Sequence, residues 1–129
     1  MEINSSKQIK NFKSDKKAEE LYNKICELLI AAGYSRARLP NLEPLDKILG
    51  GITWSLMICF VEVEFEYKDE MSLGEKIRIC EKITKALKLA NCPININPVQ
   101  LQGLDLENIF TLFQWLIKNM HETQDIRKD

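Results

Sequence analysis

Several residue types on which protein chemistry depends are scarce in this sequence. There is a single histidine, His121, and the four cysteines are spread along the chain without a C-x-x-C pair. Zinc sites need closely spaced cysteine or histidine ligands, so this spacing excludes the common zinc motifs. Each cysteine lies among apolar residues, which is typical of reduced thiols in an intracellular protein. We therefore expect neither a metal ion nor a disulfide framework.

The five glycines also lack the spacing of a nucleotide-binding loop. A phosphate-binding loop places its lysine after the glycines, whereas Lys47 precedes Gly50 and Gly51. There is no G-x-G-x-x-G motif for a dinucleotide. His121 lies in a charged C-terminal stretch that is typical of a solvated helix end, and nucleophilic catalysis would need a base beside a serine or cysteine. We expect no cofactor and no catalytic residue.

Neither a membrane segment nor an extreme charge marks the chain. The apolar run over 52–61 is much shorter than the roughly 20 residues that a membrane-spanning helix needs. The first residues lack the apolar stretch of a secretory signal peptide, so we expect a cytoplasmic protein. The net charge of −1 and the isoelectric point near 5.9 give no reason to expect nucleic-acid binding.

What the sequence does contain is helical periodicity. Apolar residues make up 45% of the 129 residues, enough for the core of one domain. A first helix is predicted to begin near Ser14 or Asp15 and to end at Gly33. Its apolar stripe consists of Leu21, Ile25, Leu28, Leu29 and Ala32.

The stretch "DKILGGITWSLMICF", residues 46–60, is harder to interpret. Pro44 suits the first position of a short helix, and Gly50 is expected to end that helix. The following apolar run does not distinguish a buried helix from a buried strand, although its leucine and methionine favour a helix. We expect the glycines to serve packing and turning, and Lys47 to be a solvated charge.

Two segments show the alternation of a half-buried strand. In 60–67 three glutamates alternate with apolar residues, and in 34–39 Arg36 and Arg38 alternate with Ala37 and Leu39. Our hypothesis is that the two segments pair, with the arginines opposite the glutamates. The predicted fold class is mainly α with this short two-stranded β element.

The second half of the chain predicts two more long helices. Ser72 and Glu75 form a capping box that opens a helix reaching about Ala90. A connection rich in proline and asparagine follows, with one short turn after Pro98, and Asp105 then caps the last helix. The predicted core stripes are Leu73, Ile77, Cys80, Ile83, Thr84 and Leu87 in the first helix, and Leu106, Ile109, Phe110, Phe113, Leu116, Ile117 and Met120 in the second.

Two surfaces are candidates for binding a partner. Arg78, Lys82 and Lys85 share the polar arc of the helix over 72–90, and they form either a solvated face or a contact for an acidic partner, such as a tubulin tail or a phospholipid head group. Trp115 falls opposite the core stripe of the last helix. It either packs against a second layer of the domain or anchors a partner, because tryptophan is frequent among interface hot spots.

The order of three segments, "ELLIAAGYSRARLPNLEPLDKILGGITW", "SLGEKIRICEKI" and "QLQGLDLENIFTLFQWLIK", resembles the N-terminal domain of the coiled-coil domain-containing protein 93 family. The resemblance covers residues 21–129. Its most specific pieces are "AAGYSRAR", "DKILGGITW" and "FQWLIK". Residues 1–20 and the stretch "LKLANCPININP" do not contribute to it.

The resemblance implies a calponin-homology-like helical domain over 15–124, preceded by a flexible basic segment over 1–14 and followed at 125–129 by the start of a linker to a coiled coil. It implies a non-enzymatic interaction module in a scaffold subunit of an endosomal recycling complex. The implied partners are coiled-coil domain-containing protein 22, the COMM-domain proteins, retriever and the WASH complex. The implied location is cytoplasmic, peripheral on early or recycling endosomes. No catalytic or binding residue carries over from the family.

A second hypothesis comes from other calponin-homology relatives, in kinetochore and intraflagellar-transport proteins, that bind microtubules through basic faces. Under it, tubulin is the partner of Arg78, Lys82 and Lys85. The net charge of −1 and the interleaved glutamates argue against strong attraction to an acidic polymer.

Overall fold

The regular elements of the computed structural model are all helical within residues 16–59, 63, 65–68 and 70–128, which are the residues that the structure describes. They are α2 (Lys16–Ala32), the 3₁₀ helix η1 (Ser35–Arg38), α3 (Pro44–Cys59), α4 (Leu73–Leu89), α5 (Pro98–Gln102) and α6 (Leu106–Lys128). The mainly α fold class is confirmed. No helix in these ranges is both long and apolar enough to cross a membrane. The segment over 1–14, expected to be flexible, lies outside the described residues.

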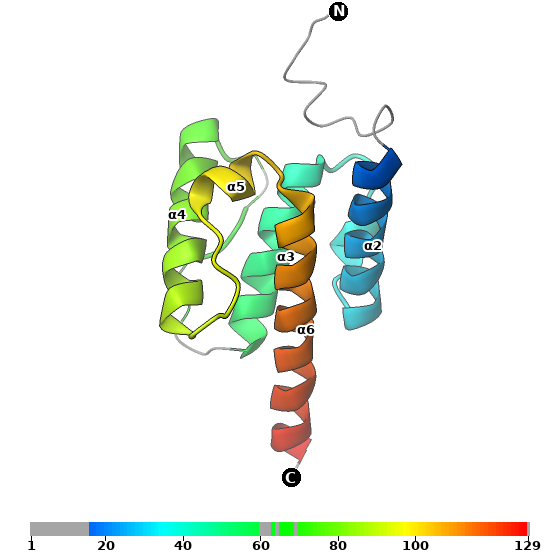
Figure 1. Cartoon of the computed structure of the whole chain (residues 1–129), viewed down its shortest axis with the longest axis vertical. Coiled ribbons are helices and arrows are strands. Elements are labelled where there is room, and N and C mark those ends of the chain that lie inside the picture. Colours follow the sequence, from blue (N-terminus) through cyan, green and yellow to red (C-terminus); the bar gives the residue numbers. More distant parts are fainter. Residues whose placement is uncertain (1–15, 60–62, 64, 69, 129) are drawn as a thin grey trace, which may run out of the picture.

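Helix α3 lies at the centre, with α4 on one side and α6 on the other (Figure 1). Helix α6 is the longest helix of the described residues. It packs chiefly against α2 and α3, and the short η1 packs on α2 and α3 as well. Helix α4 lies on the other side of α3 and contacts α3 and the short α5. The C-terminal turns of α6 extend past the ends of the other helices (Figure 1).

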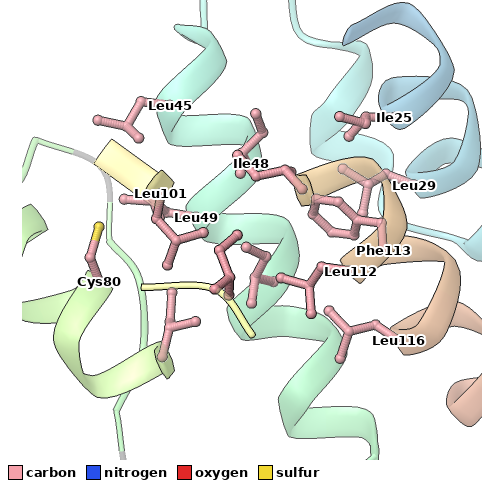
Figure 2. Close-up of a cluster of buried hydrophobic side chains, with 14 of the residues drawn as sticks. Ile25, Leu29, Leu45, Ile48, Leu49, Cys80, Leu101, Leu112, Phe113 and Leu116 are labelled. Atoms are coloured by element: carbon pink, nitrogen blue, oxygen red, sulfur yellow. The ribbon is translucent and has the colours of Figure 1, made fainter. Parts of the chain in front are cut away.

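The core lies where these helices meet (Figure 2). Phe113 of α6 is the largest fully buried side chain. Around it converge side chains from α2, α3 and α6, while Cys80 of α4 and Leu101 of α5 close the core on the other side of α3. The labelled members of this cluster are Ile25, Leu29, Leu45, Ile48, Leu49, Cys80, Leu101, Leu112, Phe113 and Leu116.

The prediction that Gly50 ends a helix is wrong, because α3 runs without a break from Pro44 to Cys59. Both glycines allow close approach. A Cβ at Gly51 would lie 2.9 Å from the two methyl groups of Leu29, and a Cβ at Gly50 would overlap the hydroxyl oxygen of Tyr34. The preference for a helix over 52–59 is confirmed. The hydroxyl groups of its buried polar residues are satisfied, because Thr53 and Ser55 donate hydrogen bonds to backbone carbonyls one turn earlier.

The predicted strand over 34–39 is also wrong. Gly33 ends α2 as expected, with a φ of +111° that suits glycine. The chain then forms η1, in which Ala37 donates to the Tyr34 carbonyl and Leu39 to the Arg36 carbonyl. Four residues are too few for alternation to separate a strand from a tight helical turn.

The second predicted strand, over 60–67, lies partly outside the described residues. Of this segment, Val63 and 65–67 belong to no helix or strand. Phe65 and Tyr67 pack against the core, whereas Glu66 is exposed and forms an ion pair with Lys68 at 3.6 Å. The alternation therefore marked which side chains face the core. Two of the three glutamates of the proposed arginine–glutamate pairing lie outside the described residues, so that contact stays a prediction.

The two long C-terminal helices, α4 and α6, begin where the sequence indicates, directly after Ser72 and Asp105. The capping box of Ser72 and Glu75 opens α4, and a second capping box of Asn97 and Gln100 opens α5 after the proline-rich connection.

The predicted core stripes need several corrections. Ile77 and Ile117 are only half-buried and do not belong to the core cluster, whereas Ile79 is buried and was missed. Leu73 is 69% exposed, because it lies in the first turn of α4, beyond the buried residues. Leu112 was missed although it is fully buried, because α6 is packed on two sides and buries a wider arc than one stripe.

Candidate functional site

Burial favours the neutral form of three of the four cysteine thiols. Burial raises the pKa of Cys80 to about 11, and it also raises the pKa values of Cys26 and Cys92. A thiol is a good nucleophile or metal ligand only as the thiolate. The four cysteines form no disulfide with one another, and across the described ranges no three His, Cys, Asp or Glu side chains come together in a way that could hold a metal ion.

Lys47 is buried, which corrects the expectation of a solvated charge. Its residue surface is 8% exposed, and its ammonium lies 5.9 Å from the centre of the Tyr22 ring. The aliphatic stem packs between α2 and α3 while the charge is placed over an aromatic face. Gly50 and Gly51 lie inside α3, where amide groups point along the helix axis and form no phosphate cradle. The stretch is therefore a packing element.

The exposed face of α4 carries the most distinctive charge pattern of the described surface. The helix contains five basic and two acidic residues, although the whole chain has a net charge of −1. Arg78, Lys82 and Lys85 are all exposed, and none of them takes part in an ion pair with another residue that the structure describes. Spaced i, i+4 and i+7, they form one basic stripe along the helix.

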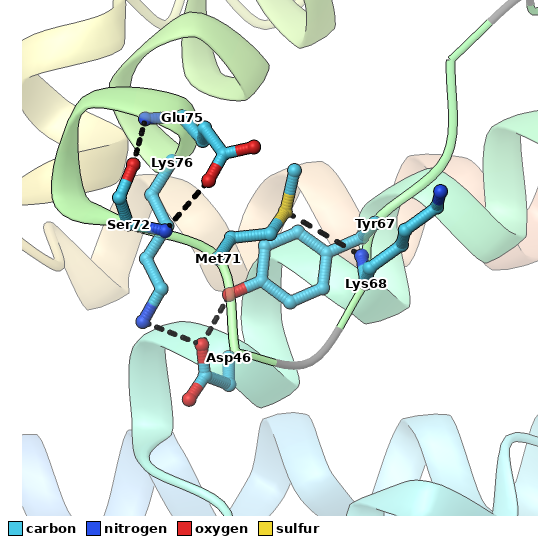
Figure 3. Close-up of polar contacts among 7 residues, drawn as sticks. All are labelled: Asp46, Tyr67, Lys68, Met71, Ser72, Glu75 and Lys76. Atoms are coloured by element: carbon cyan, nitrogen blue, oxygen red, sulfur yellow. Dashed lines mark hydrogen bonds and ion pairs between the residues drawn. The ribbon is translucent and has the colours of Figure 1, made fainter.

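Lys76, on the same helix, is used differently (Figure 3). Its ammonium lies 3.0 Å from the Asp46 carboxylate of α3, and the two side chains are only 17% and 19% exposed. The Tyr67 hydroxyl donates a hydrogen bond to the same carboxylate. This cluster ties α4 to α3 and to the segment between them, so Lys76 belongs to the internal structure and not to the basic stripe.

The basic stripe ends on an apolar residue. Leu89 is 78% exposed at the C-terminal end of α4, four residues after Lys85. On a helix the positions 78, 82, 85 and 89 fall within a narrow arc and span about 16 Å. The opposite side of α4 is fixed in the core by Ile79, Cys80, Ile83 and Leu87. The stripe is thus presented outward on a firmly packed helix.

Trp115 lies on α6, away from the basic stripe, so the structure does not bring the two candidate surfaces into one site. The indole is half-buried and packs against the hydrophobic core. Its backbone carbonyl accepts a hydrogen bond of 2.9 Å from the Asn119 side chain.

Sequence reasoning missed two features of these surfaces. Leu89 could have been found by continuing the spacing of Arg78, Lys82 and Lys85 by one more turn. The cluster of Asp46, Tyr67 and Lys76 had no signal, because its members are 21 and 30 positions apart, and no local pattern links residues at such distances.

Comparison with known proteins identifies the family. The family model described as the CCDC93 protein N-terminal domain matches residues 16–122. The chain is 39% identical over 115 residues to coiled-coil domain-containing protein 93 of Mus musculus, and this match covers 88% of the chain and 18% of that protein. It is 42% identical over 103 residues to the Gallus gallus protein, covering 78% and 17%. Its identity to the Dictyostelium discoideum homolog is 36% over 116 residues, covering 86% and 18%.

These relatives are much longer than the part that matches. The chain spans less than a fifth of the length of each of the three. The match nevertheless extends through all six helical elements, from the first residue of α2 into the C-terminal half of α6. The chain belongs to the coiled-coil domain-containing protein 93 family and carries that family's N-terminal domain.

Proposed function

We propose that this chain is a non-enzymatic protein-interaction domain of calponin-homology-like type, within a coiled-coil scaffold subunit of an endosomal recycling complex. The observation that carries the proposal is the family match over residues 16–122. The raised pKa values of three cysteine thiols and the use of Lys47 in packing support a binding role over a catalytic one. The domain takes up residues 15–124 and precedes a coiled coil.

The partners proposed from the family resemblance are coiled-coil domain-containing protein 22, the COMM-domain proteins, retriever and the WASH complex. They would place this cytoplasmic protein peripherally on early or recycling endosomes. Within the domain, Trp115 and the basic stripe are the residues proposed to contact partners. A half-buried indole supports this role because it offers apolar contact area at little cost in side-chain entropy.

An affinity experiment tests this function. The immobilised chain is incubated with purified complexes of each proposed partner, as wild type and as Trp115→Ala. We expect at least one partner to be retained, and the variant to bind it at least about 30-fold more weakly, as is typical of a tryptophan hot spot.

The matched control is Trp54→Phe. It changes the other tryptophan, which is half-buried and contacts Tyr34 with ring centroids 5.2 Å apart. It is expected to leave partner binding unchanged, and circular dichroism checks that both variants are folded. Equal binding by wild type and Trp115→Ala would remove Trp115 as an anchor. Failure of the wild type to retain any of the partners would refute the proposed function.

Binding to microtubules is the second candidate, and the absence of ion pairs to the basic stripe within the described surface is the observation that favours it. Tubulin tails are acidic, and attraction to them would weaken as salt screens the charges. Co-sedimentation with microtubules at low and physiological salt tests this candidate. Salt-sensitive pelleting that is lost when Arg78, Lys82 and Lys85 are changed to glutamate would support it, and salt-independent or absent pelleting would exclude it.

A further inference from the structure

We propose that the outer face of α4 binds an acidic, amphipathic helical segment of a partner protein, which lies along the basic stripe and packs an apolar side chain on Leu89. The inference rests on the proposed function, because it takes the domain to be a protein-binding module. It adds to that function the surface that is used and the chemistry of the partner, which changes along the helix from acidic opposite the basic stripe to apolar opposite Leu89.

The charge of this face argues for an acidic partner. Arg78, Lys82 and Lys85 project from α4 without an ion pair to any residue that the structure describes, whereas Lys76 on the same helix is neutralised by Asp46. The helix has two acidic residues: the Glu75 carboxylate accepts a hydrogen bond of 2.9 Å from the Ser72 amide, and Glu81 is exposed beside the stripe. With five basic residues on the same helix, the positive charge prevails. The stripe is therefore a local positive patch that complements a run of carboxylates.

The spacing of the stripe argues for a helix as the occupant. The positions 78, 82, 85 and 89 repeat by four, three and four residues, as residues along one edge of a helix–helix contact do. A partner helix with acidic residues at the same spacing can place a carboxylate opposite every basic group at once. An extended acidic tail lacks this periodic match.

Leu89 argues against a purely electrostatic contact. It is among the most exposed apolar residues of the described surface, at 78%, and it lies at the end of the stripe. A leucine there adds apolar area that a lipid head group or a uniformly acidic tail would leave uncovered. The partner is therefore expected to carry an apolar residue about one helical turn beyond its acidic residues.

The test uses a fluorescent synthetic peptide of about 14 residues, long enough to follow the stripe. It carries glutamates at i, i+4 and i+7 and a leucine at i+11, and a control peptide has serine in place of the leucine. Binding is followed by anisotropy. We expect the leucine peptide to bind at least about fivefold more tightly than the serine peptide, and binding to weaken as salt rises.

Variants of the chain assign the binding to the stripe. Changing Arg78, Lys82 and Lys85 together to glutamate is expected to weaken peptide binding at least tenfold. The matched control changes three exposed basic residues on α2 and α6 in the same way, Lys16, Lys24 and Lys118, and is expected to stay within about twofold of wild type.

The apolar end of the stripe has its own pair of variants. Leu89→Ser is expected to remove the advantage of the leucine peptide over the serine peptide. Val99→Ser, at a 75% exposed residue of α5, is the matched control and is expected to leave that advantage in place.

Three results would overturn the inference. Equal losses in both charge-reversal triples would show that total charge alone governs binding. Residue-dependent binding to phosphatidylserine vesicles without binding to the leucine peptide would assign the face to a membrane. Self-association that disappears on stripe reversal, measured by light scattering, would assign the face to a second copy of the chain.

The same variants separate this inference from the proposed function. If the proposed partners still bind after stripe reversal, the inference fails and the function stands. If no proposed partner binds the wild type while the peptide still depends on the stripe and on Leu89, the proposed function fails and the inference stands.

Discussion

Two glycines of α3, Gly50 and Gly51, matter because they have no side chain and neighbouring residues can pack closely against them. Gly50 is the clearest case, because its missing side chain is the reason that Tyr34 can lie against α3, where its ring contacts Trp54 at a tilt of 37°. Gly51 does the same for Leu29 of α2, which lets two helices approach closely. Glycine inside a helix usually destabilises it by about 0.5–1 kcal/mol, so its presence at two successive positions points to packing.

At the residue scale, we predict that Gly50→Ala destabilises the domain by about 1–3 kcal/mol, because the new methyl overlaps the Tyr34 hydroxyl. Urea denaturation measures the change. In the double variant Gly50→Ala with Tyr34→Phe, the loss is expected to be smaller than the sum of the single losses, since the clashing oxygen is gone.

Gly74→Ala is the control for this prediction. Gly74 is exposed in the first turn of α4, and a Cβ there would meet nothing closer than the Ser72 hydroxyl at 4.0 Å. Alanine should therefore be neutral or stabilise by up to about 1 kcal/mol. Equal effects of alanine at Gly50 and Gly74 would contradict the packing role of Gly50.

Among the elements, the helix ends depend on local hydrogen bonds. Asp105 precedes α6 and accepts hydrogen bonds from the side chains of Asn108, at 2.7 Å, and Gln100, at 3.0 Å. The bond from Asn108 is the main cause that holds the pKa of Asp105 below its ordinary value. A carboxylate with a lowered pKa stabilises the fold above its unfolded pKa, near 3.9, and that stability is lost as pH falls through the folded pKa.

At the element scale, we predict that Asp105→Ala costs about 1 kcal/mol at neutral pH through loss of the cap. Asp105→Asn still caps, but it has no charge to lose. Thermal melts between about pH 5 and pH 2 should therefore show a smaller fall in Tm for Asp105→Asn than for wild type.

A nearby acidic residue provides the comparison. Glu107 forms an ion pair with Lys17 at 2.8 Å, but the side chains are 65% and 76% exposed, so Glu107→Gln should change stability by less than about 1 kcal/mol. If wild type and Asp105→Asn lost stability in parallel on acidification, the proposed role of the Asp105 charge would be wrong.

In the whole molecule, α6 joins α2 and α3, because it packs against both helices and its side chains enter the core between them. Phe113 is fully buried at this junction. Its ring would lie 3.4 Å from a Cβ atom added at Gly51. A domain of this size has a total stability of roughly 5–15 kcal/mol, so one large side chain here accounts for a sizeable part of it.

At this scale, we predict that Phe113→Ala destabilises the domain by about 3–5 kcal/mol, because the cavity opens between three helices. Phe110→Ala, at a half-buried position of the same helix, should cost clearly less. Chemical denaturation followed by circular dichroism compares the two. A larger loss at Phe110 than at Phe113 would contradict the central place of Phe113 in the core.

The sequence by itself determined those features whose signals lie within a few residues. Gly33 ends α2, the capping box of Ser72 and Glu75 starts α4, and the spacing of apolar residues places α6 and the mainly α class. The exposed basic stripe also follows from spacing within one helix. All of these depend on hydrogen bonds and side-chain positions that repeat along a single element.

Only the tertiary structure decided which distant residues pack against Gly50, Lys47 and Asp46. The sequence predicts a helix end at Gly50, whereas in the structure Tyr34 occupies the space beside this glycine. It predicts a solvated charge at Lys47, whereas the ammonium lies over the Tyr22 ring. Asp46 likewise gains its role from Lys76, 30 positions later. The physical reason is the same each time: periodicity states which side of an element is apolar, whereas close packing between distant segments decides which neighbour fills that side.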